Sequence, residues 1–476
     1  MTVSRAGSEA GWLRPAVLLV LAVTALRWLL LAFNRTDLFV DESQYWLWGQ
    51  EFAFGYYSKP PLIAWLIGWV TWLAGSDAPF WVRMPGAALH GATALILGAL
   101  AARAGGRNLA LWVVAGYLTL PMVAAGSLLI STDTVMAPFF AAALLFHARL
   151  LEKGRARDAL LAGAMVGIAC LAKYAGAYFL VGVVLAALLR RDLRPWPGHA
   201  ALILLAWAVV LSPNVLWNLN HGLSTLSHTA DNIGWVRQDS LLAGLNPAGL
   251  LEFWGAQFGV AGPVVMAALV AGLWHLRRHA QWAAFVLPPL AVVSLQALME
   301  KAYANWAVAA YFAGTVLAMT VLAGWPRLRA AGVGLNALIC IALPLLTLFP
   351  TLGPAERPWL ARQLGRADMS QQIIALAKAN GAAAVLSEDR DVLADLFYTG
   401  RDAGLAFYAP RPAGRPMNHY EQSYPLPEGF DAPLLLVAQS PPACAGAAFP
   451  LDAAGGAYAR RGLGAWLLPA GCQPAL

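Results

Sequence analysis

Charged residues are scarce in this sequence of 476 residues. Asp, Glu, Lys and Arg together make up 12%, whereas 59% of the residues are hydrophobic and the mean hydropathy is +0.60. Soluble domains carry about 25% charged residues, so this composition excludes a soluble protein. It indicates a chain that crosses a membrane several times.

Common signatures of soluble enzymes are also missing. The sequence holds no GxxxxGK phosphate loop, no HExxH helix and no CxxC pair, so none of the chemistry tied to these motifs is indicated. His221 and His228 are separated by six residues in a predicted loop, and no further ligand follows at metal-binding spacing. They are more simply interpreted as ordinary loop histidines.

Cysteine is rare, with four residues in the whole chain. Cys170 and Cys340 fall in apolar runs, whereas Cys444 and Cys472 lie in the C-terminal tail. An oxidising compartment permits a Cys444–Cys472 disulfide. Spacing alone does not fix this pairing, so two free thiols remain the alternative.

Long apolar runs are abundant. A helix that crosses a hydrocarbon core of about 30 Å needs about 20 predominantly apolar residues. We find eleven candidate runs, at 15–33, 80–102, 109–129, 133–150, 158–172, 175–189, 200–217, 255–275, 281–298, 305–323 and 331–350. The first run is longer than a signal-peptide core and lacks a cleavage site, so it is predicted to be a retained helix.

The basic residues predict the orientation, because Lys and Arg accumulate in cytoplasmic connections. They lie in turns that each follow an even-numbered run, at 103–107, 149–157, 190–194, 277–278 and 327–329. A cytoplasmic N-terminus therefore makes every basic turn cytoplasmic. The net charge of +7 comes largely from these turns, so nucleic acid is not an expected partner.

Two long connections and the tail are then predicted to face outward. Residues 41–80 are rich in Trp, Tyr and Phe and are broken at Lys59-Pro60-Pro61, which predicts amphipathic helices along the outer surface with a turn between them. The connection at 218–254 is long enough to suggest a substrate-binding segment, with a solvated loop as the alternative.

The tail changes character. From residue 354 onward, helix-like segments alternate with short apolar strand-like segments such as 382–387 and 433–439. This alternation predicts a small α/β domain. We therefore expect a membrane domain at 1–353 and an exported domain at 354–476.

Acidic residues on the predicted outer face are the first candidates for chemistry. An ionisable group at membrane depth usually marks a substrate path or a reaction centre. Asp41 and Glu42 directly follow the first span, and a carboxylate there could act as general base on a hydroxyl. Asp133 begins another span, where it could join the same site or simply cap the helix.

Basic residues near the outer span ends are the second group. Lys and Arg bind phosphate through point charges or planar forks, although each could alone be a side chain that extends to the interface. The group comprises Lys59, Arg83, Lys173, Arg237 and Lys301. Together with the carboxylates they fit a site that transfers a sugar from a lipid-linked phosphate.

Several segments in this order resemble a known family. DESQYWLWGQ, GYYSKPPLIAWLI, WVRMPGAAL, ISTDTVMAPFF, LAKYAG, LSPNVLWNLNHG and ANWAVAAYF are similar to segments of bacterial GT-C glycosyltransferases. The group includes relatives of protein O-mannosyltransferases and aminoarabinose transferases, in glycosyltransferase families 39 and 83. The resemblance covers roughly the first 320 residues, and the acidic pair with the KPP turn is its most specific part.

The resemblance implies a membrane-embedded inverting transferase with a GT-C fold that uses a polyprenyl-phosphate sugar on the outer face of the bacterial inner membrane. Asp41 would be the catalytic carboxylate with Glu42 beside it, and Asp133 a second acidic group. By the same likeness Lys59, Arg83 and Lys173, with Tyr174 of LAKYAG, would line the donor site. Lys301 resembles a late outer-loop motif, and Met417 to Tyr420 resembles a segment of some bacterial members.

The acceptor and the cofactors are less constrained. The tail lacks the β-trefoil of eukaryotic protein mannosyltransferases, which favours lipid A, lipopolysaccharide or another envelope glycan and leaves protein as the alternative. A divalent ion could bridge Asp41, Asp133 and the phosphate, or the basic residues could neutralise the charge without one.

Two non-enzymatic functions also fit a polytopic chain. Transporters and flippases often show inverted repeats and broken helices at the midplane, and no repeat is visible in this sequence. A scaffold with an exported binding domain would require neither Asp41 nor Lys59.

Overall fold

A computed structural model describes residues 11–231, 245–354, 357–453 and 456–472. The chain divides into two compact units. We call them the helical unit, comprising Met1–Ala32, Lys59–Ile63 and Arg83–Pro344, and the sheet unit, comprising Phe33–Ser58, Ala64–Val82 and Leu345–Leu476. Arg237, in the predicted outer connection, lies outside the described residues.

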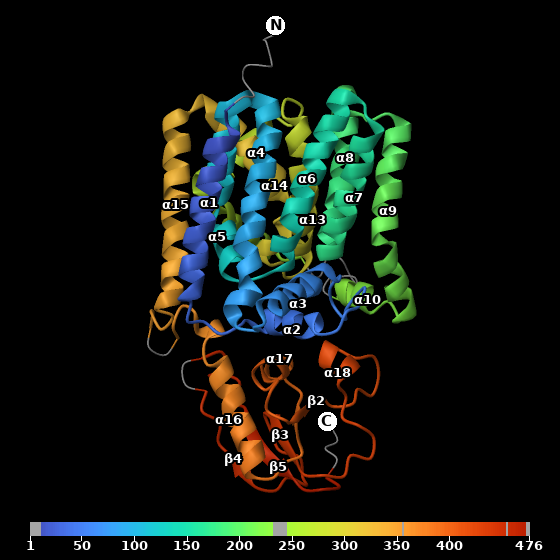
Figure 1. The fold of residues 1–476 in the computed structure, drawn as a ribbon, viewed down its shortest axis with the longest axis vertical. Coiled ribbons are helices and arrows are strands. Elements are labelled where there is room, and N and C mark those ends of the chain that lie inside the picture. The colour runs from blue at the N-terminus through green and yellow to red at the C-terminus, as the bar shows by residue number, and fades with distance from the viewer. Residues whose placement is uncertain (1–10, 232–244, 355–356, 454–455, 473–476) are drawn as a thin grey trace. The chain divides into compact units, whose positions relative to one another are not determined.

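The helical unit is built almost entirely of α-helices that run side by side (Figure 1). The α-helices are α1 (Leu13–Ala32), α4 (Pro79–Leu118), α5 (Pro121–Leu128), α6 (Thr132–Lys153), α7 (Ala156–Ala172), α8 (Tyr178–Leu189), α9 (Pro197–Asn220), α10 (Ser224–Asp231), α11 (Pro247–Ala261), α12 (Pro263–Trp274), α13 (Ala280–Met299), α14 (Ala310–Val321) and α15 (Pro326–Leu348). Short 3₁₀ turns lie at Tyr174–Ala177, Arg191–Leu193, Ala304–Ala307 and Leu322–Gly324. The helices α4 and α15 each extend across a boundary between the units.

Several of these helices could cross a membrane. Six of the described helices are long and apolar enough, or seven if α11 and α12, which are bent by 115°, form one span. Each of the eleven predicted runs coincides with one or two helices. The runs at 80–102 and 109–129 share α4, which is broken at Gly105 and Gly106, where Gly106 has φ 71°. The several apolar helices are confirmed, and the number eleven stays a prediction.

Local chemistry explains where α6 begins and ends. The Ser131 hydroxyl accepts from the Thr134 N–H as N-cap, Asp133 lies in the first turn and Lys153 in the last. Both charges are favourable at those ends of the helix dipole. Gly154 follows with φ 58°, the left-handed conformation that glycine adopts most easily at a helix C-terminus.

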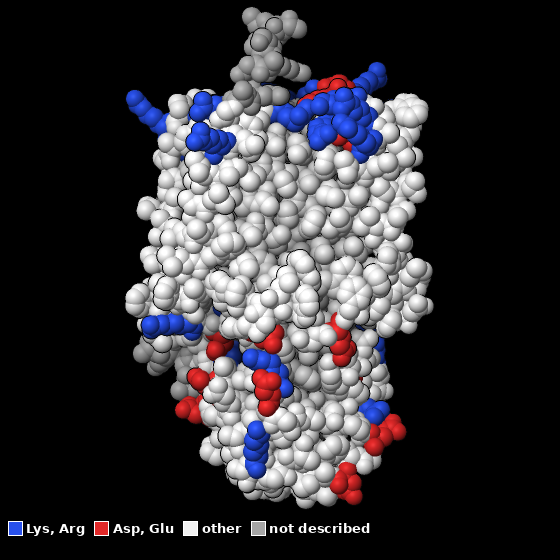
Figure 2. All heavy atoms as spheres, viewed as in Figure 1, with Lys and Arg blue, Asp and Glu red and all other residues white. Residues whose placement is uncertain are grey.

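Charge is segregated along the helical unit. Figure 2 shows Lys and Arg gathered at the end where α6 is joined to α7, while the described residues across the middle of these helices present no charge on this face. At that end Arg149 pairs with Asp158 at 3.0 Å, and Arg103 pairs with Glu152. Asp133 and Lys173 are at the opposite ends of α6 and α7.

The sheet unit combines N-terminal segments with the C-terminal residues. Its helices are α2 (Val40–Gly49), most of α3 (Leu62–Ala74), α16 (Arg366–Ala379), α17 (Arg390–Thr399) and α18 (His419–Ser423). Its strands are β1 (Ala384–Ser387), β2 (Ala406–Tyr408), β3 (Leu434–Ala438), β4 (Ala448–Phe449) and β5 (Gly464–Leu468). The strand order is β2-β1-β3-β5-β4, with β1 parallel to β2 and β3, and β5 antiparallel to β3 and β4.

The core of the sheet unit contains residues from both ends of the chain. Val385 of β1, Leu435 of β3 and Ile373 of α16 are fully buried, and Val40 of α2 belongs to the same cluster at 4% exposed. The predicted outer helix α2 therefore packs into the core of this unit as well as supplying aromatic side chains. The break predicted at Lys59-Pro60-Pro61 is confirmed, because α3 begins at the next residue.

The expected helices and strands of the tail are present, and β4 and α18 were not predicted. Cys444 and Cys472 form a disulfide, which is one of the two alternatives that the sequence left open, and Cys170 and Cys340 are free. The described residues of the tail form a five-stranded sheet with helices, and a separate α/β domain stays a prediction. The boundary at residue 354 stays a prediction.

Candidate active site

Asp41 lies in the first turn of α2. The helix is started by Glu42, whose Oε2 accepts from the Phe39 N–H at 2.9 Å, an arrangement that satisfies a backbone donor at the helix N-terminus. Glu42 is 1% exposed, whereas the Asp41 side chain is 45% exposed. Of the predicted acidic pair, the structure thus makes Glu42 a capping residue and leaves Asp41 accessible.

An arginine that the sequence did not indicate holds Asp41. Arg390, the first residue of α17, donates from Nη2 to Asp41 Oδ1 at 2.6 Å and from Nε to Gln44 Oε1 at 3.0 Å. Asp41 Oδ2 accepts no hydrogen bond among the described residues. The carboxylate is therefore fixed at one oxygen and available at the other.

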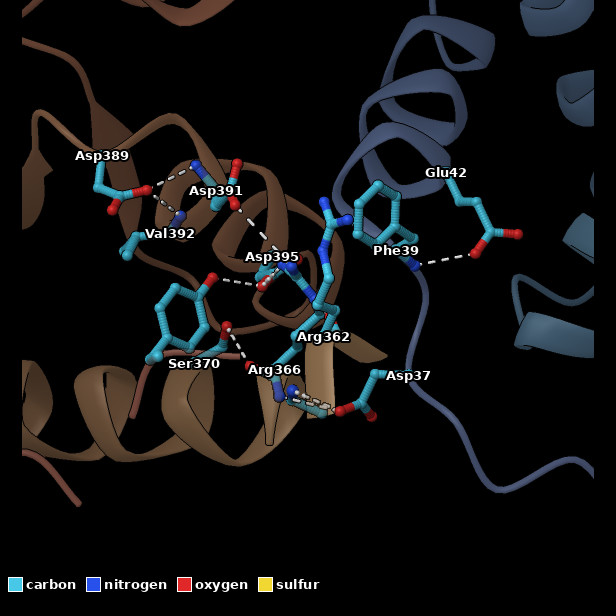
Figure 3. A network of polar contacts seen from close by, with 12 residues as sticks. Asp37, Phe39, Glu42, Arg362, Arg366, Ser370, Asp389, Asp391, Val392 and Asp395 are labelled. Atoms are coloured by element: carbon cyan, nitrogen blue, oxygen red, sulfur yellow. Dashed lines mark hydrogen bonds and ion pairs between the residues drawn. The ribbon is translucent and has the colours of Figure 1, made fainter. Parts of the chain in front are cut away.

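The segment before α2 is bound to α16 (Figure 3). Asp37 Oδ2 accepts from the N–H groups of Arg366 and Ala367 at 2.9 and 3.4 Å. Burial raises the pKa of Asp37, and these two N–H groups partly oppose that rise. Asp37 thus acts as a cap for a helix more than 300 residues away along the chain.

Arg366 also contacts this segment through its charge. Its guanidinium lies 5.2 Å from the centre of the Phe39 ring and donates to Asp395 Oδ2 at 2.9 Å. The same oxygen accepts from the Tyr458 hydroxyl at 2.5 Å. These contacts, drawn in part in Figure 3, join α2, α16 and α17 into one polar network.

A second carboxylate–cation pair lies in the helical unit. Lys173 Nζ donates to both oxygens of Asp133, at 2.8 and 2.9 Å. The side chains are 20% and 10% exposed, respectively. Ser131 is the N-cap of α6, so Asp133 is not needed for that role and is free to orient Lys173.

Tyr174, the residue after Lys173, is hydrogen-bonded to α9. Its hydroxyl donates to Asn214 Oδ1 at 2.8 Å, and Asn218 Nδ2 donates to the hydroxyl at 3.3 Å. Asn214 and Asn218 are both 1% exposed and four residues apart on one helix, which places them on the same face. This spacing within an apolar run was the signal by which the sequence could have identified them.

The other predicted basic residues are less clearly placed. Arg83 is 2% exposed on α4, Lys59 is half-buried at the break before α3, and Lys301 is exposed with its ammonium 4.9 Å from the Tyr303 ring centre. Their roles stay predictions. Among the residues described, no three metal-type side chains come together, and His221 stacks on Trp217.

The segment Met417 to Tyr420 has a structural explanation. Asn418 Oδ1 caps α18 by accepting from the N–H groups of Tyr420 and Glu421 at 2.9 and 3.0 Å. Tyr420 is fully buried in the core of the sheet unit. The His419 ring packs edge-on to Trp48 of α2, and burial lowers its pKa to about 3.

Comparison with known proteins decides the family. The chain is 39% identical over 443 residues to the lipid A galacturonosyltransferase RgtD of Rhizobium johnstonii, covering 91% of this chain and 92% of that protein. The chain belongs to the GT-C glycosyltransferases. Residues 58–217 of the transferase also match the family described as dolichyl-phosphate-mannose-protein mannosyltransferase.

Solved structures agree on the fold of the transferase. ArnT from Cupriavidus metallidurans bound to undecaprenyl phosphate is similar with a TM-score of 0.67 at 16% identity, covering 96% of this chain and 99% of that chain. Its apo form gives a TM-score of 0.62 at 16% identity, covering 89% and 92%. The predicted resemblance to ArnT and protein mannosyltransferase relatives is confirmed.

Proposed function

We propose that this glycosyltransferase moves a sugar from a polyprenyl-phosphate carrier to lipid A, and that the sugar is galacturonic acid. The observation that carries the proposal is the 39% identity to a lipid A galacturonosyltransferase along 91% of the chain. Likeness of fold to a protein bound to undecaprenyl phosphate supports the class of donor.

Asp41 and Lys173 would have different roles in the proposed reaction. Asp41 Oδ2 would accept the proton of the acceptor hydroxyl, a general-base role that requires an available carboxylate oxygen. The hydroxyl oxygen forms the new bond to C1 of the sugar, and the bond from C1 to the phosphate oxygen breaks with inversion. Lys173, oriented by Asp133, would carry the positive charge that stabilises the departing phosphate.

Topology supports an outer-face reaction. The basic ends of α6 and α7 would be the cytoplasmic ends by the positive-inside rule, so Asp133 and Lys173 would lie at the outer ends of these helices. We therefore propose eleven spans in the inner membrane and an exported C-terminal α/β domain, residues 354–476, that belongs to the same compact unit as α2.

Mass spectrometry of lipid A tests the proposal. Cells that lack the protein are complemented with the native form or with Asp41→Asn, and the purified protein is supplied with undecaprenyl-phosphate galacturonic acid and lipid A. We expect one hexuronic acid residue on lipid A with the native form and none with the variant. An unchanged lipid A combined with loss of mannose from exported proteins would instead favour a protein acceptor, the alternative suggested by the family match at 58–217.

A further inference from the structure

Arg390 lies in the first turn of α17, and this turn is fixed by an N-cap. Asp389 is the N-cap of α17, and its Oδ1 accepts from the N–H groups of Asp391 and Val392 at 2.8 and 3.3 Å. The carboxylates of Asp389 and Asp391 are both engaged by Arg461. The acidic neighbours of Arg390 are thus occupied, and its own guanidinium reaches α2.

The Arg390 guanidinium donates hydrogen bonds to two side chains on one face of α2. Asp41 and Gln44 are three residues apart, so their side chains project from neighbouring points of the helix. Arg390 donates through two different nitrogens, Nη2 to Asp41 and Nε to Gln44. Because the guanidinium is planar and rigid, two such bonds fix the direction from which it approaches the carboxylate.

Stability does not explain this contact. The Asp41 and Arg390 side chains are 45% and 36% exposed, and ion pairs at such exposure typically contribute about 1 kcal/mol or less. The helix is already attached by Val40 in the core and by the Asp37 cap of α16. Loss of Arg390 should therefore leave α2 in place.

We propose that Arg390 is a positioning residue: it holds Oδ1 of Asp41 so that Oδ2 is presented to the acceptor hydroxyl. The inference rests on the proposed function, in which Asp41 is the general base. It makes catalysis by the N-terminal acidic motif depend on a side chain of the C-terminal segment. Arg390 itself would contact neither the sugar nor the phosphate.

The test measures turnover by the full-length protein at saturating and at limiting concentrations of the sugar donor. Arg390→Ala should lower kcat by about 10- to 100-fold, the size expected when a catalytic group is misplaced by about 1 Å, and leave the KM for the donor unchanged. Arg390→Lys should recover part of the loss, and added methylguanidinium should restore turnover to Arg390→Ala. Arg411→Ala, which removes an exposed arginine paired with Glu428 in the same unit, is the matched control and should retain full activity.

The double variant Asp41→Asn with Arg390→Ala separates the possible causes. If Arg390 acts through Asp41, the double variant is no slower than Asp41→Asn alone, because the effects of residues that act as a unit are not additive. Normal or increased turnover of folded Arg390→Ala, or loss that methylguanidinium and Lys fail to relieve, would overturn the inference. An active Asp41→Asn would overturn the role of Asp41 itself, which distinguishes failure of the proposed function from failure of this inference.

Discussion

The two carboxylate–cation pairs differ in the number of carboxylate oxygens that accept a hydrogen bond from the cation, and in the exposure of the carboxylate. Asp133 accepts from Lys173 at both oxygens, at 2.8 and 2.9 Å, and its side chain is 10% exposed. Asp41 accepts from Arg390 at one oxygen, at 2.6 Å, and is 45% exposed. Asp133 is thus bonded through both carboxylate oxygens, whereas Asp41 is bonded to Arg390 through one, which fits the general-base role proposed for Asp41.

The largest effect expected from this difference is that of Asp41→Asn. Loss of a general base typically slows a reaction by about 10² to 10⁴-fold, and the amide also cannot form the ion pair with Arg390. Transfer of sugar to lipid A by purified protein measures the change. Asp133→Asn should cost less, since Asp133 only orients Lys173 in the proposed mechanism. A larger loss with Asp133→Asn would reverse the two assignments.

Removal of Lys173 should have the next largest effect. A hydrogen bond to a charged group is worth about 1.5 to 3 kcal/mol, so Lys173→Met should lower kcat/KM for the donor by about 10- to 100-fold. The melting temperature of the variant in detergent should also be lower than that of the native protein, because Asp133 would be left in a nearly buried position without its counter-charge. Equal melting temperatures for Lys173→Met and Arg390→Ala would contradict the contrast between a buried and an exposed pair.

A pH-dependent loss of stability is expected in the sheet unit from His419. Its folded-state pKa of about 3 lies below the ordinary value of 6.5, so the unfolded chain binds the extra proton and stability declines as the pH falls from 6.5 toward 3. Between pH 7.5 and pH 5 this lowers the free energy of unfolding by up to about 2 kcal/mol.

His419→Gln isolates that contribution. Glutamine keeps a neutral polar side chain, so the variant should lose less stability on acidification than the native protein does. This variant is needed because burial also raises the pKa of Asp395, to about 7. Protonation of Asp395 stabilises the folded state as the pH falls, which opposes the effect of His419. Melting curves with the same pH dependence in both proteins would show that His419 is not the titrating group.

The smallest effect is expected for Lys301→Ala. The ammonium is exposed and contacts the Tyr303 ring at 4.9 Å, an interaction worth about 0.5 to 1 kcal/mol at such sites. Turnover should change less than twofold if the residue is an interface side chain. A loss as large as that of Lys173→Met would instead place Lys301 among the phosphate ligands.

The sequence predicted those features that depend on local patterns. Apolar runs located the helices, and the short strand-like segments of the tail located β1, β2, β3 and β5. Asp133 and Lys173 were selected separately and are found bonded to each other. The sequence left open whether Cys444 and Cys472 pair, and the structure shows the disulfide.

Long-range contacts could not be predicted in this way. Arg390 follows two acidic residues and directly precedes the helix-like segment at 391–400, and nothing local distinguishes it from an ordinary surface arginine. Its contact with Asp41 depends on the packing of Val40 and Phe39 against a core formed more than 300 residues later. Glu42 was likewise proposed for chemistry because its capping geometry appears only in three dimensions.

The inclusion of Val40 in the core of the sheet unit has a consequence for biosynthesis. Ribosomes make α2 long before β1, β3 and α16, so the helix that carries Asp41 waits for nearly the whole polypeptide before its packing is complete. Contacts between residues so far apart in sequence form slowly. A prematurely terminated chain would therefore contain α2 without the core that packs around Val40 and without the Arg390 contact to Asp41.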